Sequence, residues 1–421
     1  MEGRVFGIDK VIYIFFEYHE SCRMETKCDD IFADTITQFL IKEFRRPDID
    51  LTYDFFLEAF PTRLDPRGTW RDIYIGELRQ MVAKTLSYDP TADKVSRSEV
   101  LPRVRLHYID IRDYLFENIF YYGIDLVYGL GRDLYVSVVC NGNPNGVAPF
   151  CDRLTEAVLR FRDQLDEING LFFVLSPQSQ PGGAGTAPAP APVPTPASRP
   201  RRVIRPPGEE IPAPEKLEIT LHLIRKIKEQ YRHPEVKTVI TRMLDDYLKE
   251  GLVSMRRHID TVVRLLADLK ELASVNPSIL NEKAKVDVDI PGFTQQVSYG
   301  PDIDAMTEVV VRVDHLLSAV KKVSYDTGTV VTDAYFLRRF LDKDYVTNGV
   351  SYTGARHSDM YVHMLAKYFD FKVTHASYTR YDLKTLNEKI KGPLGTEFSL
   401  SLRPPVRQQC SDLSSFPEGF T

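Results

Sequence analysis

The feature that most restricts the fold of this chain is a segment rich in proline, alanine and glycine at residues 176–214. It reads SPQSQPGGAGTAPAPAPVPTPASRPRRVIRPPGEEIPAP and has few large apolar residues before Val203. Such a segment buries too little apolar surface to offset the conformational entropy that folding removes. We therefore predict a disordered linker between residues 1–175 and residues 215–403, with a loose tail at 404–421.

The first part alternates apolar runs with a helical pattern. A helical spacing of apolar residues extends roughly from Asp29 to Glu43 and lies between the first two runs. The runs read as buried strands, and they are residues 11–16, 53–58 and 104–110. Strand, helix and strand at this spacing predict βαβ units and a mainly parallel sheet.

The second part begins with long amphipathic patterns that predict helices, at residues 217–231, 235–273, 302–320 and 333–341. A strand at 349–353, a helix at 358–369 and a short strand at 371–375 follow. Because this part has few strands of its own, we expect them to join the sheet of the first part. The prediction is one α/β domain, a mainly parallel sheet with flanking helices, interrupted by the disordered linker.

Composition excludes several classes of protein. Hydrophobic residues make up 43% and charged residues 27% of the 421 residues, as in a globular protein rather than a disordered chain or a coiled-coil rod. A net charge of −5 gives no reason to expect nucleic acid as a partner. No run of about 18 apolar residues is present, so no membrane association is expected. The first ten residues lack a signal-peptide pattern, and five scattered cysteines suit reduced thiols, so we expect an intracellular protein.

The first candidate site residues follow the first predicted strand. Glu17 and His19 are two positions apart, so an extended backbone places both side chains on one face. Ligands of parallel α/β sheets bind beyond the carboxyl ends of the strands, where this pair would lie. A carboxylate and an imidazole there could share a proton, hold a metal ion or activate water. The alternative is a strand that ends at the surface in ordinary polar residues.

Two further strands end in charged residues. Glu58 closes the second predicted strand and would lie at the same edge, although a helix cap or a surface carboxylate is an alternative. Asp110 and Arg112 follow the third strand and alternate onto one face, where they could hold the anionic group of a substrate. A structural salt bridge between these two residues is the simpler interpretation.

A second histidine motif lies near the C-terminal end of the chain. Gly354 follows the strand at 349–353, and His357 comes just before the helix that begins at residue 358. The glycine permits a tight turn that would place the imidazole above the sheet edge. Arg339, in the helix just upstream, could present a cation to the same edge, although a solvated helix-face arginine is the alternative.

The chemistry of this residue set leaves two mechanisms open. Two histidines and two glutamates could bind Zn, Mn or Co with one position left for water. They could equally form a metal-free pair in which one residue is the base and another orients it. A serine nucleophile has no support, because no Gly-x-Ser-x-Gly elbow is present. Cys22 and Cys28 follow His19 closely, but their spacing is not a standard zinc pattern.

The order of these motifs resembles that of the erythromycin esterase, ChaN and TraB/Tiki superfamily of α/β proteins. Members typically show Gly-Glu-x-His after the first strand and Gly-x-x-His after a late strand. Glu17 and His19 match the first motif, and Gly354 and His357 match the second. Glu58 matches the acid of the second strand. The similarity is greatest to uncharacterised members from large double-stranded DNA viruses, which would place the protein in the host cytoplasm or the virion.

The resemblance implies a hydrolase whose site is formed by both halves of the chain. It implies catalytic roles for Glu17, His19, Glu58 and His357, and Arg339 matches a helical arginine. From their places at the strand ends we expect Asp110, Arg112 and Gly354 to bind the substrate. In the Tiki branch the histidines and a glutamate resemble ligands of a divalent metal, which would make Glu17, His19 and His357 the ligands here. In the esterase branch a histidine acts as the base without a metal, and the ChaN branch binds haem.

One departure from the pattern supports a different function. The glycine expected before the first glutamate is Phe16 in this chain, and a bulky ring there would crowd the approach of a ligand to the backbone. The alternative is therefore a catalytically inactive relative that binds a protein partner through the helices at 217–273. That alternative predicts an exposed apolar stripe on these helices.

Overall fold

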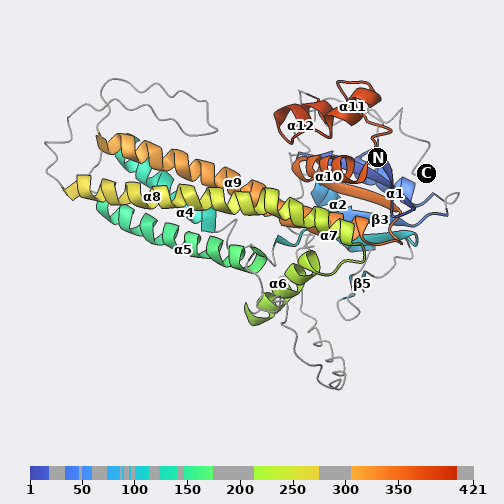
Figure 1. The fold of residues 1–421 in the computed structure, drawn as a ribbon, viewed down its shortest axis with the longest axis horizontal. Helices are drawn as coiled ribbons and strands as arrows, with labels where there is room; N and C mark the ends of the chain where they lie inside the picture. Colours follow the sequence, from blue (N-terminus) through green and yellow to red (C-terminus); the bar gives the residue numbers. More distant parts are fainter. Residues whose placement is uncertain are drawn as a thin grey trace, which may run out of the picture. The chain divides into compact units, whose positions relative to one another are not determined.

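The computed structural model of the chain describes residues 1–18, 34–46, 50–58, 74–85, 88–89, 94–95, 100–112, 123–140, 147–173, 213–274 and 305–404 (Figure 1). The chain divides into two compact units. The first comprises residues 1–111, 180–240 and 332–421, and the second comprises residues 112–179 and 241–331. Most of the predicted linker and nearly all of the predicted tail lie outside the described residues.

The first unit is built on a five-stranded sheet with the order β1-β2-β7-β3-β6. Only β1 is antiparallel to its neighbour, and the other pairings are parallel. The strands are β1 (Glu2–Val5), β2 (Ile8–Glu17), β3 (Tyr53–Leu57), β6 (Val104–Tyr108) and β7 (Asn348–Gly354). The predicted α/β fold with a mainly parallel sheet is therefore confirmed. A separate antiparallel pair consists of β4 (Tyr88–Asp89) and β5 (Lys94–Val95).

Strand β7, which comes late in the sequence, lies between the two early strands β2 and β3. Its register pairs Gly354 with Glu17 of β2 and Tyr352 with Leu57 of β3. A central parallel strand is covered on both faces, which explains why all residues of β7 from Gly349 onward are buried. This register places the carboxyl ends of β2, β3 and β7 at one edge of the sheet.

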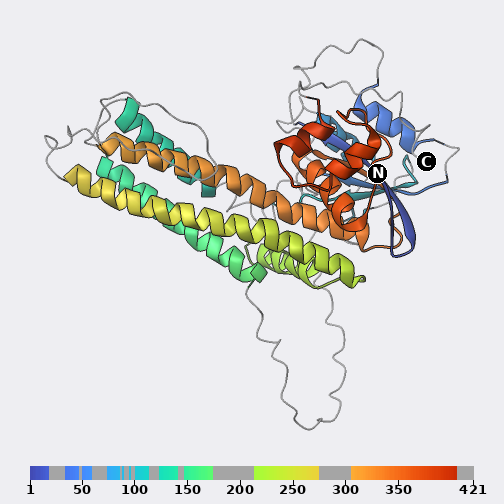
Figure 2. The ribbon, with the colours of Figure 1, turned by 45° about the horizontal axis from the view of Figure 1, so that its top comes forward.

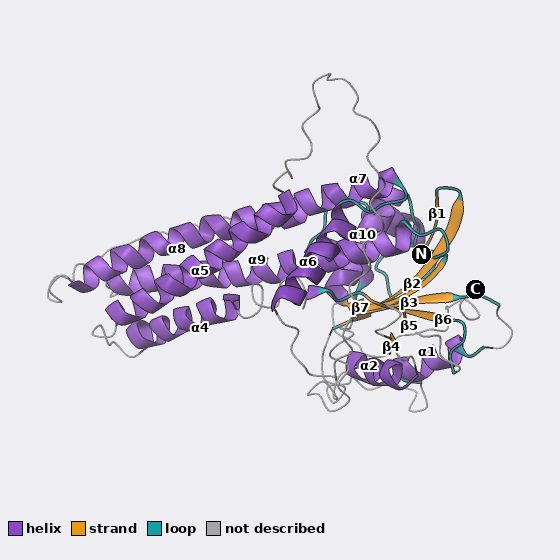
Figure 3. Ribbon diagram, turned by 90° about the horizontal axis from the view of Figure 1, so that it is seen from below, coloured by secondary structure: helices purple, strands orange, loops and turns teal. Residues whose placement is uncertain are grey.

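Helices cover both faces of the sheet, as Figure 3 shows for α1 and α2 on one side and α10 on the other. Phe55 and Leu57 of β3 pack in the apolar cluster under α1 (Ile36–Phe44) and α2 (Tyr74–Thr85). The ring of Phe56 points the opposite way and packs edge-on against Phe336 and Phe340. Both rings come from α9 (Ala305–Leu341), whose last turns thus lie on the same face as α10 (Ala355–Phe369).

Two short helices complete the first unit beside α10. They are α11 (Leu383–Lys389) and α12 (Thr396–Leu402), and their apolar residues share one cluster with Val362 and Ala366 of α10. Two more helices, α6 (Ala213–Lys228) and α7 (Pro234–Met243), follow the predicted linker in sequence. None of the helices in the described part of the chain combines the length and hydropathy that a membrane span requires.

Two sequence-based predictions of elements were wrong. The helices expected at 302–320 and 333–341 are one continuous helix, α9. Glycine and β-branched residues weaken the helical pattern between them, but Thr327, Val330 and Val331 are buried, so packing overrides local propensity. The strand expected at 371–375 is reduced to a single bridge between Lys372 and Glu2.

The second unit consists of long helices, which Figure 2 shows running side by side. They are α4 (Ile124–Tyr135) with its π-helical continuation Val136–Cys140, α5 (Val147–Phe173), α8 (Glu250–Ser274) and the first part of α9. A π-helical segment, Leu244–Lys249, connects α7 to α8. The apolar stripe of α8 is buried in this unit, and it consists of Leu252, Met255, Ile259, Val262, Leu265, Leu266 and Leu269. The exposed stripe that a partner-binding function predicts is therefore absent from the described part of α8.

One close contact in this unit gives a testable prediction. A Cβ atom added to Gly251 of α8 would collide with Oγ1 of Thr327 on α9. The Cγ2 and Cβ atoms of Thr327 would lie only 3.0 and 3.1 Å from the added atom. Because a buried threonine has little rotamer freedom, we expect Gly251→Ala to lower the free energy of unfolding by about 1–3 kcal/mol. Urea denaturation followed by circular dichroism measures this change.

A matched control for this variant is Gly129→Ala in α4, where nothing lies within 4 Å of the added methyl group. Alanine there should raise the free energy of unfolding by roughly 0.5–1 kcal/mol, because glycine is a poor helix former. Equal effects of the two substitutions would show that the close contact between α8 and α9 does not require glycine at position 251.

Candidate functional site

Three of the predicted site residues meet at the carboxyl edge of the sheet. Glu17 is the last residue of β2 and lies opposite Gly354, the last residue of β7. The backbone N–H of Gly354 donates to Oε2 of Glu58 over 2.7 Å, directly after β3. Both carboxylates are buried, with Glu17 6% and Glu58 3% exposed. Strand pairing thus brings together motifs that are far apart in the sequence.

His357 lies in the first turn of α10 and contacts a carboxylate through each ring nitrogen. Its Nε2 is 3.3 Å from Oε1 of Glu58, and its Nδ1 is 2.5 Å from Oδ1 of Asp333 on α9. The three side chains are almost completely buried. They form a continuous Asp333–His357–Glu58 chain whose members come from α9, α10 and the end of β3, and we call it the triad.

The charge of the triad is set by its two carboxylates. Burial alone would lower the pKa of His357, but the nearby charges of Asp333 and Glu58 outweigh it and raise this pKa from its ordinary 6.5 to about 10. At neutral pH the ring is therefore an imidazolium ion. A cation in the first turn of a helix is opposed by the helix dipole, so this ion depends on the carboxylates beside it.

The raised pKa of His357 predicts how stability changes with pH. Its contribution to the free energy of unfolding should be complete below pH 6.5 and be lost as the pH rises through about 10, because the folded state binds the proton more tightly. The measurement is urea denaturation of the wild type and of the triple variant Glu58→Leu/Asp333→Leu/His357→Leu between pH 6.5 and 10. The stability difference should change in favour of the variant as the pH rises, and a constant difference would contradict the assignment.

Helix α2 is attached to both acidic strand ends. The backbone N–H of Ile75, in its first turn, donates to Oε1 of Glu17 over 2.8 Å. The guanidinium of Arg79 donates to the backbone carbonyl of Glu58 over 3.2 Å from Nε and 2.5 Å from Nη2. A helix cap was the alternative role considered for Glu58, and the structure places Glu17 in that role instead.

The structure says less about the other predicted site residues. His19 lies outside the described residues, as do Cys22 and Cys28. Asp110 is buried just beyond β6, and Arg112 is half-buried. Arg339 points to a different histidine from that of the triad: its Nε donates to Nδ1 of His107 over 3.3 Å.

That histidine belongs to a second buried polar network, which the sequence analysis missed. Asp54 of β3 is fully buried and accepts from Arg105 over 2.8 and 2.6 Å and from Nε2 of His107 over 2.6 Å. Burial lowers the pKa of His107, the hydrogen bond to Asp54 opposes this effect, and the charge of Arg339 adds to it. A neutral ring therefore donates to Asp54 and accepts from Arg339. The signal was present in the sequence as a polar residue inside a buried strand.

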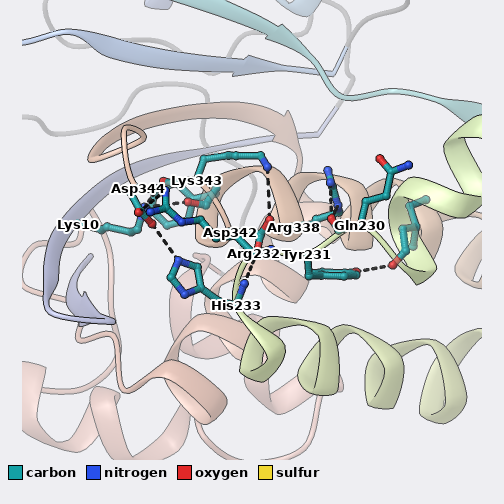
Figure 4. A network of polar contacts seen from close by, with 11 residues as sticks. Lys10, Gln230, Tyr231, Arg232, His233, Arg338, Asp342, Lys343 and Asp344 are labelled. Atoms are coloured by element: carbon teal, nitrogen blue, oxygen red, sulfur yellow. Dashed lines mark hydrogen bonds and ion pairs between the residues drawn. The ribbon is translucent and has the colours of Figure 1, made fainter. Parts of the chain in front are cut away.

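A third network, drawn in Figure 4, fixes the end of α9 near the start of β2, at the opposite edge of the sheet. Nζ of the buried Lys10 donates to the carbonyls of Phe340 over 3.1 Å, Lys343 over 2.8 Å and Val346. Burial lowers the pKa of this amine to about 8, although nearby carboxylates oppose the effect. Asp342 accepts from the backbone N–H groups of Arg232 and His233 over 2.7 and 2.9 Å. These contacts hold the helix that carries Asp333.

The triad does not suit a metal ion in this arrangement. Both ring nitrogens of His357 contact carboxylates, and an imidazolium has no lone pair to offer a metal. Among the residues that the structure describes, no group of three or more His, Cys, Asp or Glu side chains is arranged so that it could hold a metal ion. Of the three expected ligands, His357 has both ring nitrogens against carboxylates, and His19 lies outside the described residues.

Comparison with known proteins places the chain among viral relatives. It matches the family described as "Family of unknown function (DUF5847)" over residues 1–171 and 201–421. The chain belongs to this family. Uncharacterized protein R706 of Acanthamoeba polyphaga mimivirus is 29% identical over 431 residues, which cover 100% of the chain and 94% of the relative. Uncharacterized proteins R160 and R161 of the same virus are 26% and 27% identical, and each is covered over 95% of its length.

These matches bear on the predicted viral relatives. The expected similarity to uncharacterised proteins of a large DNA virus is confirmed. The DUF5847 match leaves out residues 172–200, a range that falls almost entirely within the predicted linker. No solved structure matches the chain, so the geometry described above carries the functional argument.

Proposed function

We propose that the carboxyl edge of the sheet is the active site of a hydrolase in which Glu58 activates water. The observation that carries this proposal is the triad, because three ionisable side chains from separate elements converge where α/β sheets bind ligands. The resemblance of the motifs to the erythromycin esterase, ChaN and TraB/Tiki superfamily supports the same reaction class.

Glu58 is the residue that we assign as the general base. It is the end of the triad at the strand terminus, and its two oxygens are oriented by the imidazole of His357 and the N–H of Gly354. In the proposed reaction Glu58 takes a proton from water, and the resulting hydroxide adds to the carbonyl carbon or the phosphorus atom of the substrate. The bond to the leaving group then breaks, and the proton passes from Glu58 to that group.

Energetic cost supports a functional role for the triad. Burying ionised groups is expensive, and a well-packed apolar trio of similar volume is often at least as stable. Ionisable groups with strongly shifted pKa values gather at functional sites, because catalytic acids and bases need pKa values matched to their task. The geometry favours the version of the mechanism without a metal, since His357 has no free ring nitrogen for Zn, Mn or Co.

The test is a hydrolase assay of the full-length protein and two single variants. The substrates are p-nitrophenyl acetate, bis-p-nitrophenyl phosphate and fluorescently labelled casein. We expect the wild type to hydrolyse one of them and Glu58→Gln to reduce kcat by about 100-fold or more, as the loss of a general base does. The matched control is His363→Gln, because His363 is also buried in α10 but does not belong to the triad.

Two outcomes would overturn this proposal. Equal activity of the wild type and Glu58→Gln would remove Glu58 from the mechanism. Failure to hydrolyse any substrate of the panel would favour the alternative of an inactive relative that binds a protein. In that case the partner surface would need to be different from the apolar stripe of α8, which is buried.

A further inference from the structure

We infer that His357 is a positioning residue that holds Glu58 in place, and that Asp333, to which the sequence analysis assigned no role, is the residue that fixes His357. This inference rests on the proposed function of the edge and assigns the roles within it. It differs from the role that the motif resemblance implies for the late histidine, which is that of a base or a metal ligand.

The first argument is the occupancy of the ring. An imidazole has two nitrogens, and it acts as a base or a ligand only through a nitrogen that carries a lone pair. Nδ1 of His357 is 2.5 Å from Asp333 and Nε2 is 3.3 Å from Glu58, so each nitrogen already faces a carboxylate. The raised pKa of His357 is consistent with this, since the ring then carries both protons.

The second argument is the rigidity of what holds the ring. Asp333 lies on α9, and the same helix packs Phe336 and Phe340 against Phe56 of the sheet. Beyond these rings, Lys10 binds one carbonyl in the last turn of the helix, that of Phe340, and one just after it, that of Lys343. Glu58 is oriented from the other side by the N–H of Gly354. A side chain held between such elements is suited to orient a catalytic group rather than to change its position during proton transfer.

The third argument is charge. With the ring as a cation, the triad carries two negative charges and one positive charge. The attraction of each carboxylate to the ring then offsets the repulsion between Asp333 and Glu58. Replacing Asp333 by asparagine removes the charge but keeps the size of the side chain. The ring then loses the negative charge that most favours its protonated form, while burial and the helix dipole still disfavour that form.

Nitrogen NMR of the protein labelled with ¹⁵N-histidine tests the inference without any need for activity. At pH 7.5 we expect both ring nitrogens of His357 to carry protons, with the signal assigned by its loss in His357→Gln. His363 serves as an internal control on the same helix, because burial lowers its pKa to about 4 and its ring should be neutral. In Asp333→Asn the doubly protonated signal of His357 should be lost, while that of His363 stays unchanged.

Two further measurements connect this state to the role of the residue. Titration with Co²⁺, followed by its visible absorption, should give the same result for the wild type and for His357→Gln. If the hydrolase assay detects a substrate, Asp333→Asn and His357→Gln should each lower kcat at least tenfold with KM unchanged. The double variant should be no slower than the slower single variant, because residues that act as a unit are not additive.

The outcomes are distinguishable from those of the proposed function. A neutral His357 in the wild type, or stoichiometric Co²⁺ binding that His357→Gln abolishes, would overturn the inference. A doubly protonated His357 in a protein that hydrolyses no substrate of the panel would confirm the state of the ring and contradict only the hydrolase.

Discussion

Replacing His357 by leucine is expected to lower the free energy of unfolding by about 3–5 kcal/mol, the usual cost of removing one partner from a buried ion pair. The reason is that Asp333 and Glu58 would remain buried without the cation that lies between them. Urea denaturation at pH 7 measures the change. His363→Leu is the control on the same helix, and it should cost less because burial keeps that ring neutral at this pH.

The triple variant Glu58→Leu/Asp333→Leu/His357→Leu refines this expectation. Apolar side chains of similar volume need no counter-charge, so the triple variant should be more stable than His357→Leu alone. It should also lack all activity of the site. A triple variant that is less stable than the single variant would show that packing, and not the unpaired carboxylates, explains the cost.

Lys10→Met should lower the free energy of unfolding by roughly 3 kcal/mol. The variant removes the ammonium that the carbonyls of Phe340, Lys343 and Val346 share, and it leaves buried acceptors at the end of α9. Thermal and urea denaturation at pH 7 measure this loss. The ordinary pKa of lysine makes the unfolded reference fully charged under these conditions.

The control for Lys10→Met is Lys372→Met, a change at an exposed lysine near the same edge of the sheet. Substitutions of exposed side chains usually alter stability by less than about 0.5 kcal/mol. A similar small effect of Lys10→Met would contradict the role of its ammonium in holding α9.

The sequence predicted the edge of the sheet better than the residues behind it. Glu17, Glu58 and Gly354 follow or end parallel strands, and the carboxyl ends of parallel strands necessarily share one edge. His357 comes three positions after one of these strand ends, so its approach to the edge was also predictable. Local pattern and general topology were sufficient for this part of the site.

The residues that orient the site could not be found in the same way. Asp333 lies in a helix, and helical spacing alone does not tell which strand or helix a polar side chain will face. Helical spacing likewise could not show which way Arg339 points, and this residue contacts His107 rather than the carboxyl edge of the sheet. The length of α9 was missed because burial of its middle part, and not propensity, keeps that part helical.

The central place of β7 has a consequence for how the protein forms during synthesis. β2 and β3 leave the ribosome early, yet neither pairs with the other, because the strand that joins them is made some three hundred residues later. The nascent N-terminal portion must therefore wait with unpaired strand edges, which are prone to aggregate. Chaperone demand should be high until translation has passed Gly354, and fragments that end before it should accumulate in insoluble form.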